Sequence, residues 1–170
     1  AHPAFAGWPQ FRGAGAAENS ISDFLAVCAN RSDEALADVA FGNRQRTSAK
    51  SGILKAEAAR RFAEVLQANG AERLGLTDDP ARNAQIAQAV RCIPGQGSGI
   101  SFEYFLMLAG SDRFVKADRM ICRYVGRALG HPAPVQPELA RDLLTSAADE
   151  LGIAPRTLDY GVWSLQRNLA

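Results

Sequence analysis

From Ser20 onward, the apolar residues of this chain recur at the spacing of an α-helix. No stretch alternates apolar and polar residues for long enough to form a strand. Ser20 or Ser22, Ser32 and Asp79-Pro80 stand where helices are expected to begin, because short polar side chains cap helices and proline suits the first turn. These signals predict an all-α, compact single domain of about eight helices over residues 18–170.

Each expected helix carries one apolar face, and glycine or proline punctuates the chain between helices. Asn69-Gly70 should end one helix, since glycine adopts the left-handed conformation of a C-cap easily. The side chains expected to face the core include Leu36, Val39, Leu66, Ile86, Val90, Ile121, Val125, Leu129, Leu139, Leu143, Leu144, Leu151, Val162, Leu165 and Leu169.

Residues 1–17 (AHPAFAGWPQFRGAGAA) differ from the rest in being rich in Gly, Ala and Pro. We expect an N-terminal arm that packs Phe5, Trp8 or Phe11 onto the body or stays loose. The whole chain has 19 Lys plus Arg and 18 Asp plus Glu, a net charge of +1. A nucleic-acid role must therefore depend on a local basic surface.

Three well-separated cysteines and two histidines provide no zinc-finger spacing. The cysteines are expected to be buried free thiols of a cytoplasmic protein. No apolar run approaches the roughly 20 residues that a membrane span requires. The sequence therefore predicts a cytoplasmic monomer that binds neither a membrane nor a metal.

The most specific local signal is the segment IPGQGSG at 93–99, between two predicted helices. Its alternating glycines can adopt positive φ angles and expose backbone N–H groups without obstruction. Those groups stand at a helix N-terminus, where the macrodipole favours an anion. The backbone-binding residues predicted here are Gly95, Gln96, Gly97, Ser98 and Gly99. The alternative is an ordinary tight turn between helices.

Neither a Rossmann nor a Walker-A motif fits this segment, because no strand precedes it and it lacks the Gly-Lys-Ser/Thr ending. We therefore expect no nucleotide cofactor. A monovalent cation at the hairpin is the only cofactor that remains open.

The arrangement of helix, IPGQGSG and helix resembles the hairpin of the helix-hairpin-helix DNA glycosylase superfamily, which includes endonuclease III and the adenine and alkylpurine glycosylases. Members also carry an essential Asp near the start of a later helix. The segment VKADRMICR at 115–123 supplies Asp118 at the family's distance from the hairpin. The resemblance extends over residues 20–170, and its specific motifs lie in 93–125.

The resemblance implies an enzyme that binds duplex DNA and removes a damaged or modified base, with Asp118 as the catalytic residue. A carboxylate there stabilises the oxocarbenium-like transition state of N-glycosidic hydrolysis. Lys116, Arg119 and Arg123 form a basic spot near Asp118 in the sequence, and phosphate contacts there would position the duplex. Gly99 occupies the position of the Schiff-base lysine of bifunctional members, so no lyase activity by that route is expected. The iron–sulfur loop is absent as well. Asp118 also suits the role of a helix N-cap, and the two roles are compatible.

A polar stretch beginning at residue 44 holds most of the local positive charge. In the resembled family, a comparable loop between helices enters the DNA and fills the gap left by the flipped base. The resemblance assigns intercalation or backbone binding to Arg44, Gln45, Arg46 and Lys50. The alternative is a solvated surface loop.

A flipped base must stack on an apolar surface. The resemblance points to Trp163, and Tyr104 is a second platform; Trp8 and Tyr160 are further candidates. Each aromatic could equally belong to the core. Glu103 and Asp159 could read a base edge. The rival functions are a non-catalytic helix-hairpin-helix DNA-binding module, in which Asp118 only caps a helix, and a helical protein-interaction domain.

Overall fold

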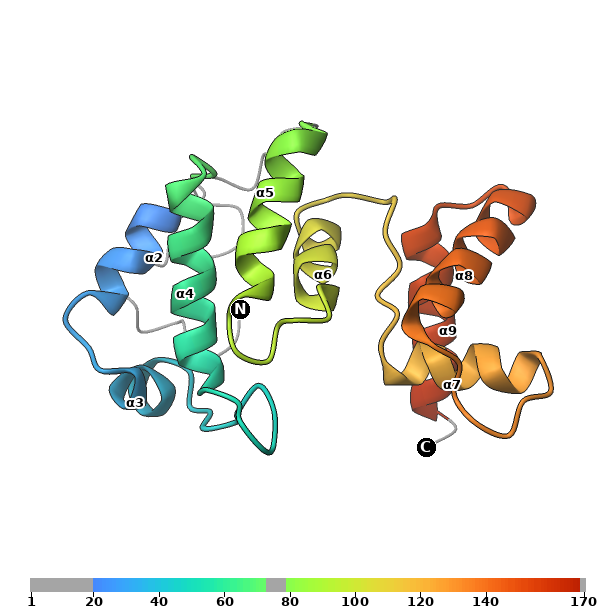
Figure 1. Ribbon diagram of the computed structural model, residues 1–170, viewed down its shortest axis with the longest axis horizontal. Coiled ribbons are helices and arrows are strands. Elements are labelled where there is room, and N and C mark those ends of the chain that lie inside the picture. The colour runs from blue at the N-terminus through green and yellow to red at the C-terminus, as the bar shows by residue number, and fades with distance from the viewer. Residues whose placement is uncertain (1–19, 73–78, 169–170) are drawn as a thin grey trace. The chain divides into compact units, whose positions relative to one another are not determined.

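The computed structural model describes residues 20–72 and 79–168, and every regular element in these two ranges is a helix (Figure 1). The elements are α2 (Ile21–Cys28), α3 (Asp33–Ala35), the π-helix η1 (Leu36–Ala40), α4 (Lys55–Ala68), α5 (Pro80–Arg91), α6 (Ile100–Leu108), α7 (Arg119–Ala128), α8 (Pro137–Leu151) and α9 (Pro155–Asn168). The predicted all-α fold is therefore confirmed. The predicted arm at 1–17, its Trp8 and the boundary at residue 18 lie outside the described residues.

The internal contacts divide the chain into two compact units. Unit 1 is Ala1–Gly99 and unit 2 is Ile100–Ala170. The hairpin at 93–99 and the polar stretch that begins at residue 44 belong to unit 1, whereas Asp118 belongs to unit 2.

Three helices of unit 1, α2, α3 and α5, begin at predicted caps. The Ser20 hydroxyl accepts a hydrogen bond from the Asp23 N–H and the Asp23 carboxylate accepts one from the Ser20 N–H, both at 3.0 Å. This reciprocal pair is a capping box. Ser32 caps α3, and Asp79 caps α5 with Pro80 in the first turn. All three caps are local, which is why the sequence predicts them correctly.

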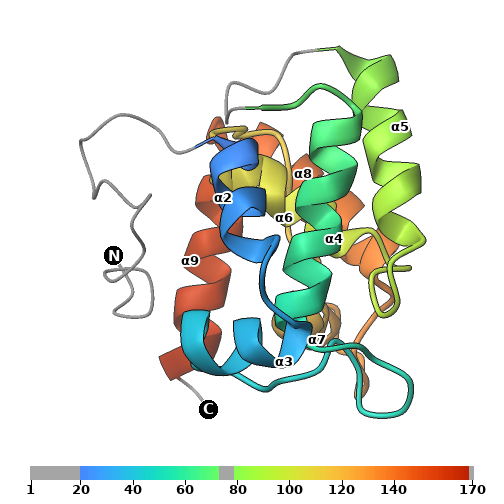
Figure 2. The ribbon, with the colours of Figure 1, turned by 90° about the vertical axis from the view of Figure 1, so that its left-hand side faces the viewer.

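The core of unit 1 lies around α4, which packs against α2, η1 and α5 (Figure 2). Leu36, Leu66, Ile86 and Val90 are almost completely buried, as predicted. Val39 is instead 76% exposed, so its predicted burial is wrong. The π-helical turn places more residues in each turn than an α-helix, and it rotates Val39 outward while Ala40 stays buried.

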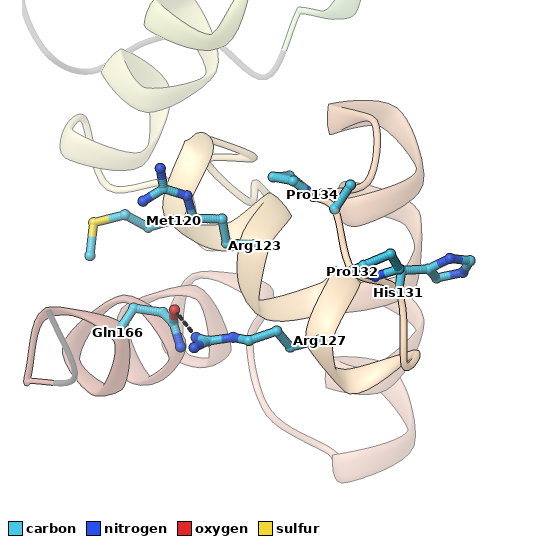
Figure 3. A pocket seen from close by; sticks show the side chains of 8 residues that line it. Met120, Arg123, Arg127, His131, Pro132, Pro134 and Gln166 are labelled. Carbon is cyan, nitrogen blue, oxygen red and sulfur yellow. Dashed lines mark hydrogen bonds between the residues drawn. The ribbon is translucent and has the colours of Figure 1, made fainter.

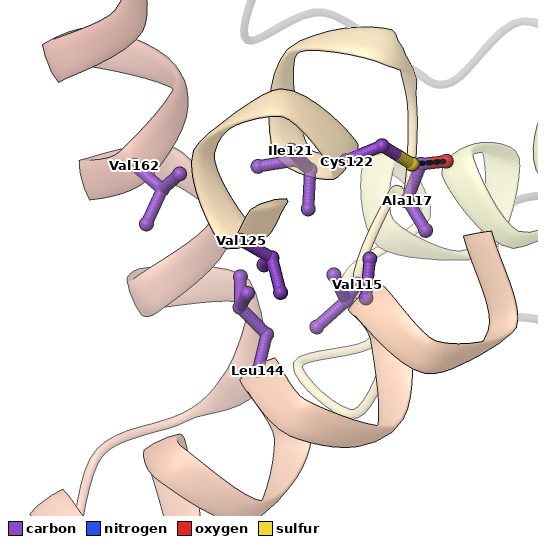
Figure 4. Packing of buried hydrophobic residues seen from close by; sticks show 8 residues of the cluster. Val115, Ala117, Ile121, Cys122, Val125, Leu144 and Val162 are labelled. Carbon is purple, nitrogen blue, oxygen red and sulfur yellow. Dashed lines mark hydrogen bonds between the residues drawn. The ribbon is translucent and has the colours of Figure 1, made fainter. Parts of the chain in front are cut away.

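Unit 2 is built on α7, α8 and α9, which pack pairwise. Its core combines the extended segment before α7 with one face of each helix (Figure 4). The principal core side chains are Val115, Ile121, Val125, Leu144 and Val162.

Five leucines of unit 2 that were expected in the core are substantially exposed. They are Leu129, Leu139, Leu143, Leu151 and Leu165, with exposed fractions between 37% and 64%. On α8 the buried stripe is Ala140, Leu144 and Ala148, which follow one another at intervals of four residues. Small alanines let neighbouring helices approach closely, and the larger leucines then lie at the edge of the contact. Leu169 lies outside the described residues.

No helix within the described ranges is both long and apolar enough to cross a membrane. Cys28 and Cys122 are buried free thiols, as expected, whereas Cys92 is exposed because it follows the last residue of α5.

Candidate functional site

The hairpin (93–99) is a double turn that leaves part of its backbone available to a ligand. The Gln96 N–H donates to the Ile93 carbonyl oxygen at 2.9 Å, and the Gly99 N–H donates to that of Gln96 at 3.0 Å. These two amides are therefore already used. In the described part of the chain, the N–H groups of Gly95, Gly97 and Ser98 have no acceptor.

The three glycines of the hairpin differ in conformation. Gly95 and Gly99 have φ angles of +82° and +77°, which side-chain-bearing residues rarely adopt. Gly97 has no positive φ, so the expectation that all three glycines use this freedom holds for two of them. A β-carbon built on Gly97 would have no atom within 4 Å. Gly97 therefore lies at the exposed tip of the hairpin, where an added β-carbon meets no other atom.

The basic stretch of unit 1 forms a loop, 43–54, closed by backbone pairing. Arg46 and Leu54 form an isolated β-bridge, and the Thr47 N–H donates to the Ile53 carbonyl oxygen at 2.9 Å. The Lys55 N–H donates to the Gln45 carbonyl oxygen at 2.8 Å. This pairing gives the loop a fixed shape.

The loop and the hairpin contact each other, although they are far apart in the sequence. The Thr47 hydroxyl donates a hydrogen bond to the Pro94 carbonyl oxygen at 2.9 Å. A β-carbon added to Gly95 would lie 2.4 Å from Thr47 Oγ1 and 2.6 Å from Thr47 Cβ. Gly95 is therefore needed for this close approach as well as for its φ angle.

The polar side chains of the loop differ in how far they are free to contact DNA. Arg44 is held by Asp38, with Nε 2.5 Å from Oδ1, and this hydrogen bond lowers the pKa of Asp38. Arg46 Nη1 donates to the Gly52 carbonyl oxygen at 2.6 Å, and Gln45 Oε1 accepts from Lys55 Nζ at 2.6 Å. Lys50 is exposed and has no partner among the described residues.

Asp118 is the N-cap of α7, as predicted. Its Oδ1 accepts the N–H groups of Met120 and Ile121 at 2.8 and 3.2 Å. Its Oδ2 lies 3.8 Å from Lys116 Nζ, and the side chain is 25% exposed. One carboxylate oxygen is thus committed to the cap, and the other has no neutral hydrogen-bond donor among the described residues.

Three more residues of unit 2 gather at Asp118, and we call the four together the Asp118 cluster. Lys116 Nζ lies 3.9 Å from the centre of the Tyr104 ring. The Lys116 N–H donates to Asp159 Oδ1 at 3.0 Å. The cluster therefore contains two carboxylates, one ammonium and one aromatic ring, contributed by α6, α9 and the segment that leads into α7.

The burial of Asp159, a member of the Asp118 cluster, was not predicted from the sequence. Its side chain is only 8% exposed. Burial, together with the nearby Asp118 charge, raises its pKa from 3.8 to about 6, and the Lys116 N–H and charge oppose this shift only in part. The sequence offered Asp159 as a reader of base edges, but no local signal indicates that an Asp four residues into a helix is buried.

The remaining predicted residues are placed as follows. Trp163 lies on α9 four residues after Asp159, with its ring 6.2 Å from that of Tyr160 and Arg167 at 5.2 Å. Glu103 is held by Arg141 Nη2 at 2.8 Å. Arg119 is exposed at the start of α7.

Within residues 20–72 and 79–168, no group of three or more His, Cys, Asp or Glu side chains is arranged to hold a metal ion. The monovalent cation at the hairpin stays a prediction.

A family model described as a domain of unknown function, DUF8548, matches residues 4–167. No curated protein and no solved structure matches the chain.

Proposed function

We propose that this chain, which belongs to the DUF8548 family, binds duplex DNA and removes a damaged or modified base by hydrolysing its N-glycosidic bond. The observation that carries the proposal is the Thr47–Pro94 hydrogen bond, which joins the two segments of unit 1 that the sequence assigned to DNA. Asp118 belongs to unit 2. Its link to this surface of unit 1 comes from the resemblance to the helix-hairpin-helix glycosylase superfamily.

The DNA-binding step rests on backbone donors and a few cations. The free N–H groups of Gly95, Gly97 and Ser98 are suited to the oxygens of one phosphate. Lys50 and the remaining N–H groups of Arg46 add positive charge in the attached loop. Such contacts hold a duplex in position without reading its sequence. A net charge of +1 does not oppose this binding, because the contacts are local.

The chemical step rests on Asp118 Oδ2, the oxygen that the helix cap leaves unused. As the bond from the sugar C1′ to the base breaks, positive charge develops on the sugar, and an adjacent carboxylate stabilises it. A water molecule adds to C1′ and passes one proton to Asp118, while the departing base takes a proton from solvent. The products are a free base and an abasic site.

Asp159 serves as a positioning residue in this account. By accepting the Lys116 N–H at 3.0 Å it fixes the segment immediately before Asp118. Lys116 Nζ, close to both Asp118 and the Tyr104 ring, makes the contacts of an ammonium ion rather than of a free amine nucleophile. We therefore expect simple hydrolysis, with no covalent enzyme–DNA complex trapped by borohydride.

Replacing Asp118 by Asn tests the assignment, because Asn is also a good N-cap and only the charge is lost. Asp79 provides a matched control: its Oδ1 accepts the N–H groups of Ala81 and Arg82 at 2.9 and 3.3 Å, in the same capping geometry. Base release is measured as abasic-site formation in duplexes containing uracil, alkylpurines, oxidised guanine or hypermodified pyrimidines.

We expect Asp118→Asn to abolish base release while DNA binding persists, and Asp79→Asn to retain both. Equal activity of Asp118→Asn and the unmodified chain would overturn the catalytic assignment. If the unmodified chain binds duplexes but releases no base from any of them, the protein is instead a non-catalytic DNA-binding module in which Asp118 only caps α7.

A further inference from the structure

A pocket of about 410 Å³ opens in unit 2 on the side of α7 opposite its buried face (Figure 3). Met120, Arg123 and Arg127 contribute from successive turns of α7, and Gln166 contributes from α9. The segment 131–134 completes the lining with His131 and two prolines. The sequence places Arg123 in a basic spot beside Asp118 and assigns no role to the rest of this lining.

One wall of this pocket, the segment 131–134, is held against α7 by packing and by backbone hydrogen bonds. A β-carbon added to Gly126 would lie 2.5 Å from the Ala133 carbonyl oxygen, so this segment packs directly on α7. The backbone N–H groups of His131 and Val135 donate to the carbonyl oxygens of Gly126 and Cys122 at 2.8 and 3.2 Å. A lining held in this way is formed before any ligand arrives.

The polar groups of the pocket are almost entirely hydrogen-bond donors. Arg127 donates to Gln166 Oε1, which fixes the orientation of the amide. Gln166 is 8% exposed, and its Nε2 has no acceptor among the described residues. Arg123 makes no ion pair with the described residues, and none of the lining residues is acidic. A buried donor without an acceptor is unfavourable, so this arrangement calls for an oxygen-rich anion.

We propose that this pocket binds a phosphate group carried by a nucleotide, either a free mononucleotide or the phosphorylated end of a DNA strand. Arg123 and Arg127 both line the pocket, and the planar guanidinium group suits phosphate geometry. The Gln166 amide supplies a neutral donor beside them. Met120 and the two prolines form the apolar part of the lining, and the pocket volume is in the range of small-molecule sites. This inference does not depend on the proposed hydrolysis of an N-glycosidic bond at Asp118.

Isothermal titration of the full chain with dAMP, with adenosine, and with short single strands that carry or lack a terminal phosphate tests the proposal. We expect saturable binding of dAMP or of the phosphorylated strand, and none of adenosine or of the unphosphorylated strand. Binding of dAMP identifies a free nucleotide, and binding of only the phosphorylated strand identifies a strand end. Either result supports a nucleotide phosphate site.

Three variants locate the binding. Arg123→Gln removes an exposed guanidinium, and Gln166→Glu places a negative charge beside Arg127; each should weaken binding about tenfold or more. Arg167→Gln, which changes an arginine of α9 outside the pocket, should have no effect. Absence of binding at millimolar concentration, or binding that both pocket variants leave unchanged, would overturn the proposal. Arg123 is on the surface, so its variant is informative even if Gln166→Glu does not fold.

Discussion

Thr47 and Pro94 are joined by a hydrogen bond from the threonine hydroxyl to the proline carbonyl oxygen, at 2.9 Å, across 47 positions of sequence. This bond holds the basic loop against the glycine hairpin. Neither segment is regular secondary structure, so a side-chain contact of this kind fixes their mutual position within unit 1. The proposed DNA surface depends on it.

Thr47→Val removes the hydroxyl while keeping the shape of the side chain. We expect the variant to lose about 0.5–1.5 kcal/mol of unfolding free energy, because the Pro94 carbonyl loses its donor. Its affinity for duplex DNA should fall as well, since the loop and the hairpin are no longer joined. Denaturant unfolding and DNA titration measure the two effects. Thr47→Ser retains the hydroxyl and should behave like the unmodified chain; equal losses in both variants would contradict the role of the bond.

Gly95→Ala and Gly97→Ala should differ sharply in stability. At Gly95 the added β-carbon meets Thr47 Oγ1 at 2.4 Å and the φ angle is +82°. We expect Gly95→Ala to lose about 1–3 kcal/mol of unfolding free energy. At Gly97 an added β-carbon meets no atom and φ is not positive. The unfolding free energy of Gly97→Ala should therefore differ from that of the unmodified chain by no more than about 1 kcal/mol. Denaturant midpoints compare the two, and similar values would show that the loop does not press on the hairpin.

Asp159→Asn should change how stability depends on pH. Burial raises the pKa of Asp159 from 3.8 to about 6, so the folded state retains a proton that the unfolded state releases in this interval. The contribution of Asp159 to stability is therefore fully present below pH 3.8 and is lost as the pH rises through about 6.

Asn cannot titrate and can still accept the Lys116 N–H. Relative to the unmodified chain, Asp159→Asn should thus gain unfolding free energy across this interval, by about 3 kcal/mol in total. Unfolding free energies measured at a series of pH values test this. A stability difference between the two proteins that is the same at every pH would refute it.

What the sequence predicts well in this chain is local. The caps at Ser20, Asp79 and Asp118 involve backbone groups two or three residues away, so residue type and position suffice to identify them. The alternating glycines of 93–99 likewise predict a turn from residue type alone. Val39 shows the limit even of local reasoning, because a π-helical turn changes which face is buried.

What the sequence does not predict depends on distant parts of the chain. Asp159 is buried because α9 packs beside the segment before α7, 43 positions away, and helical periodicity contains no such information. The exposure of Leu139 and Leu143 follows from the close approach allowed by Ala140 and Ala148. The Arg127–Gln166 contact in the unit 2 pocket joins two helices in the same way.

The central claim is that the hairpin amides hold the backbone of DNA, and the salt dependence of duplex binding by Gly97→Leu tests it most directly. Position 97 accepts a side chain without a clash, so the variant should fold and yet cover the free N–H groups. Gly161→Leu, at another open glycine, is the matched control.

For the unmodified chain and for Gly161→Leu, the logarithm of affinity should fall with the logarithm of salt concentration with a slope of about −2 or steeper, since each neutralised phosphate contributes about −0.9. Gly97→Leu should bind about tenfold more weakly, with a shallower slope. Equal affinity and equal slope in all three proteins, or binding that does not respond to salt, would contradict the account.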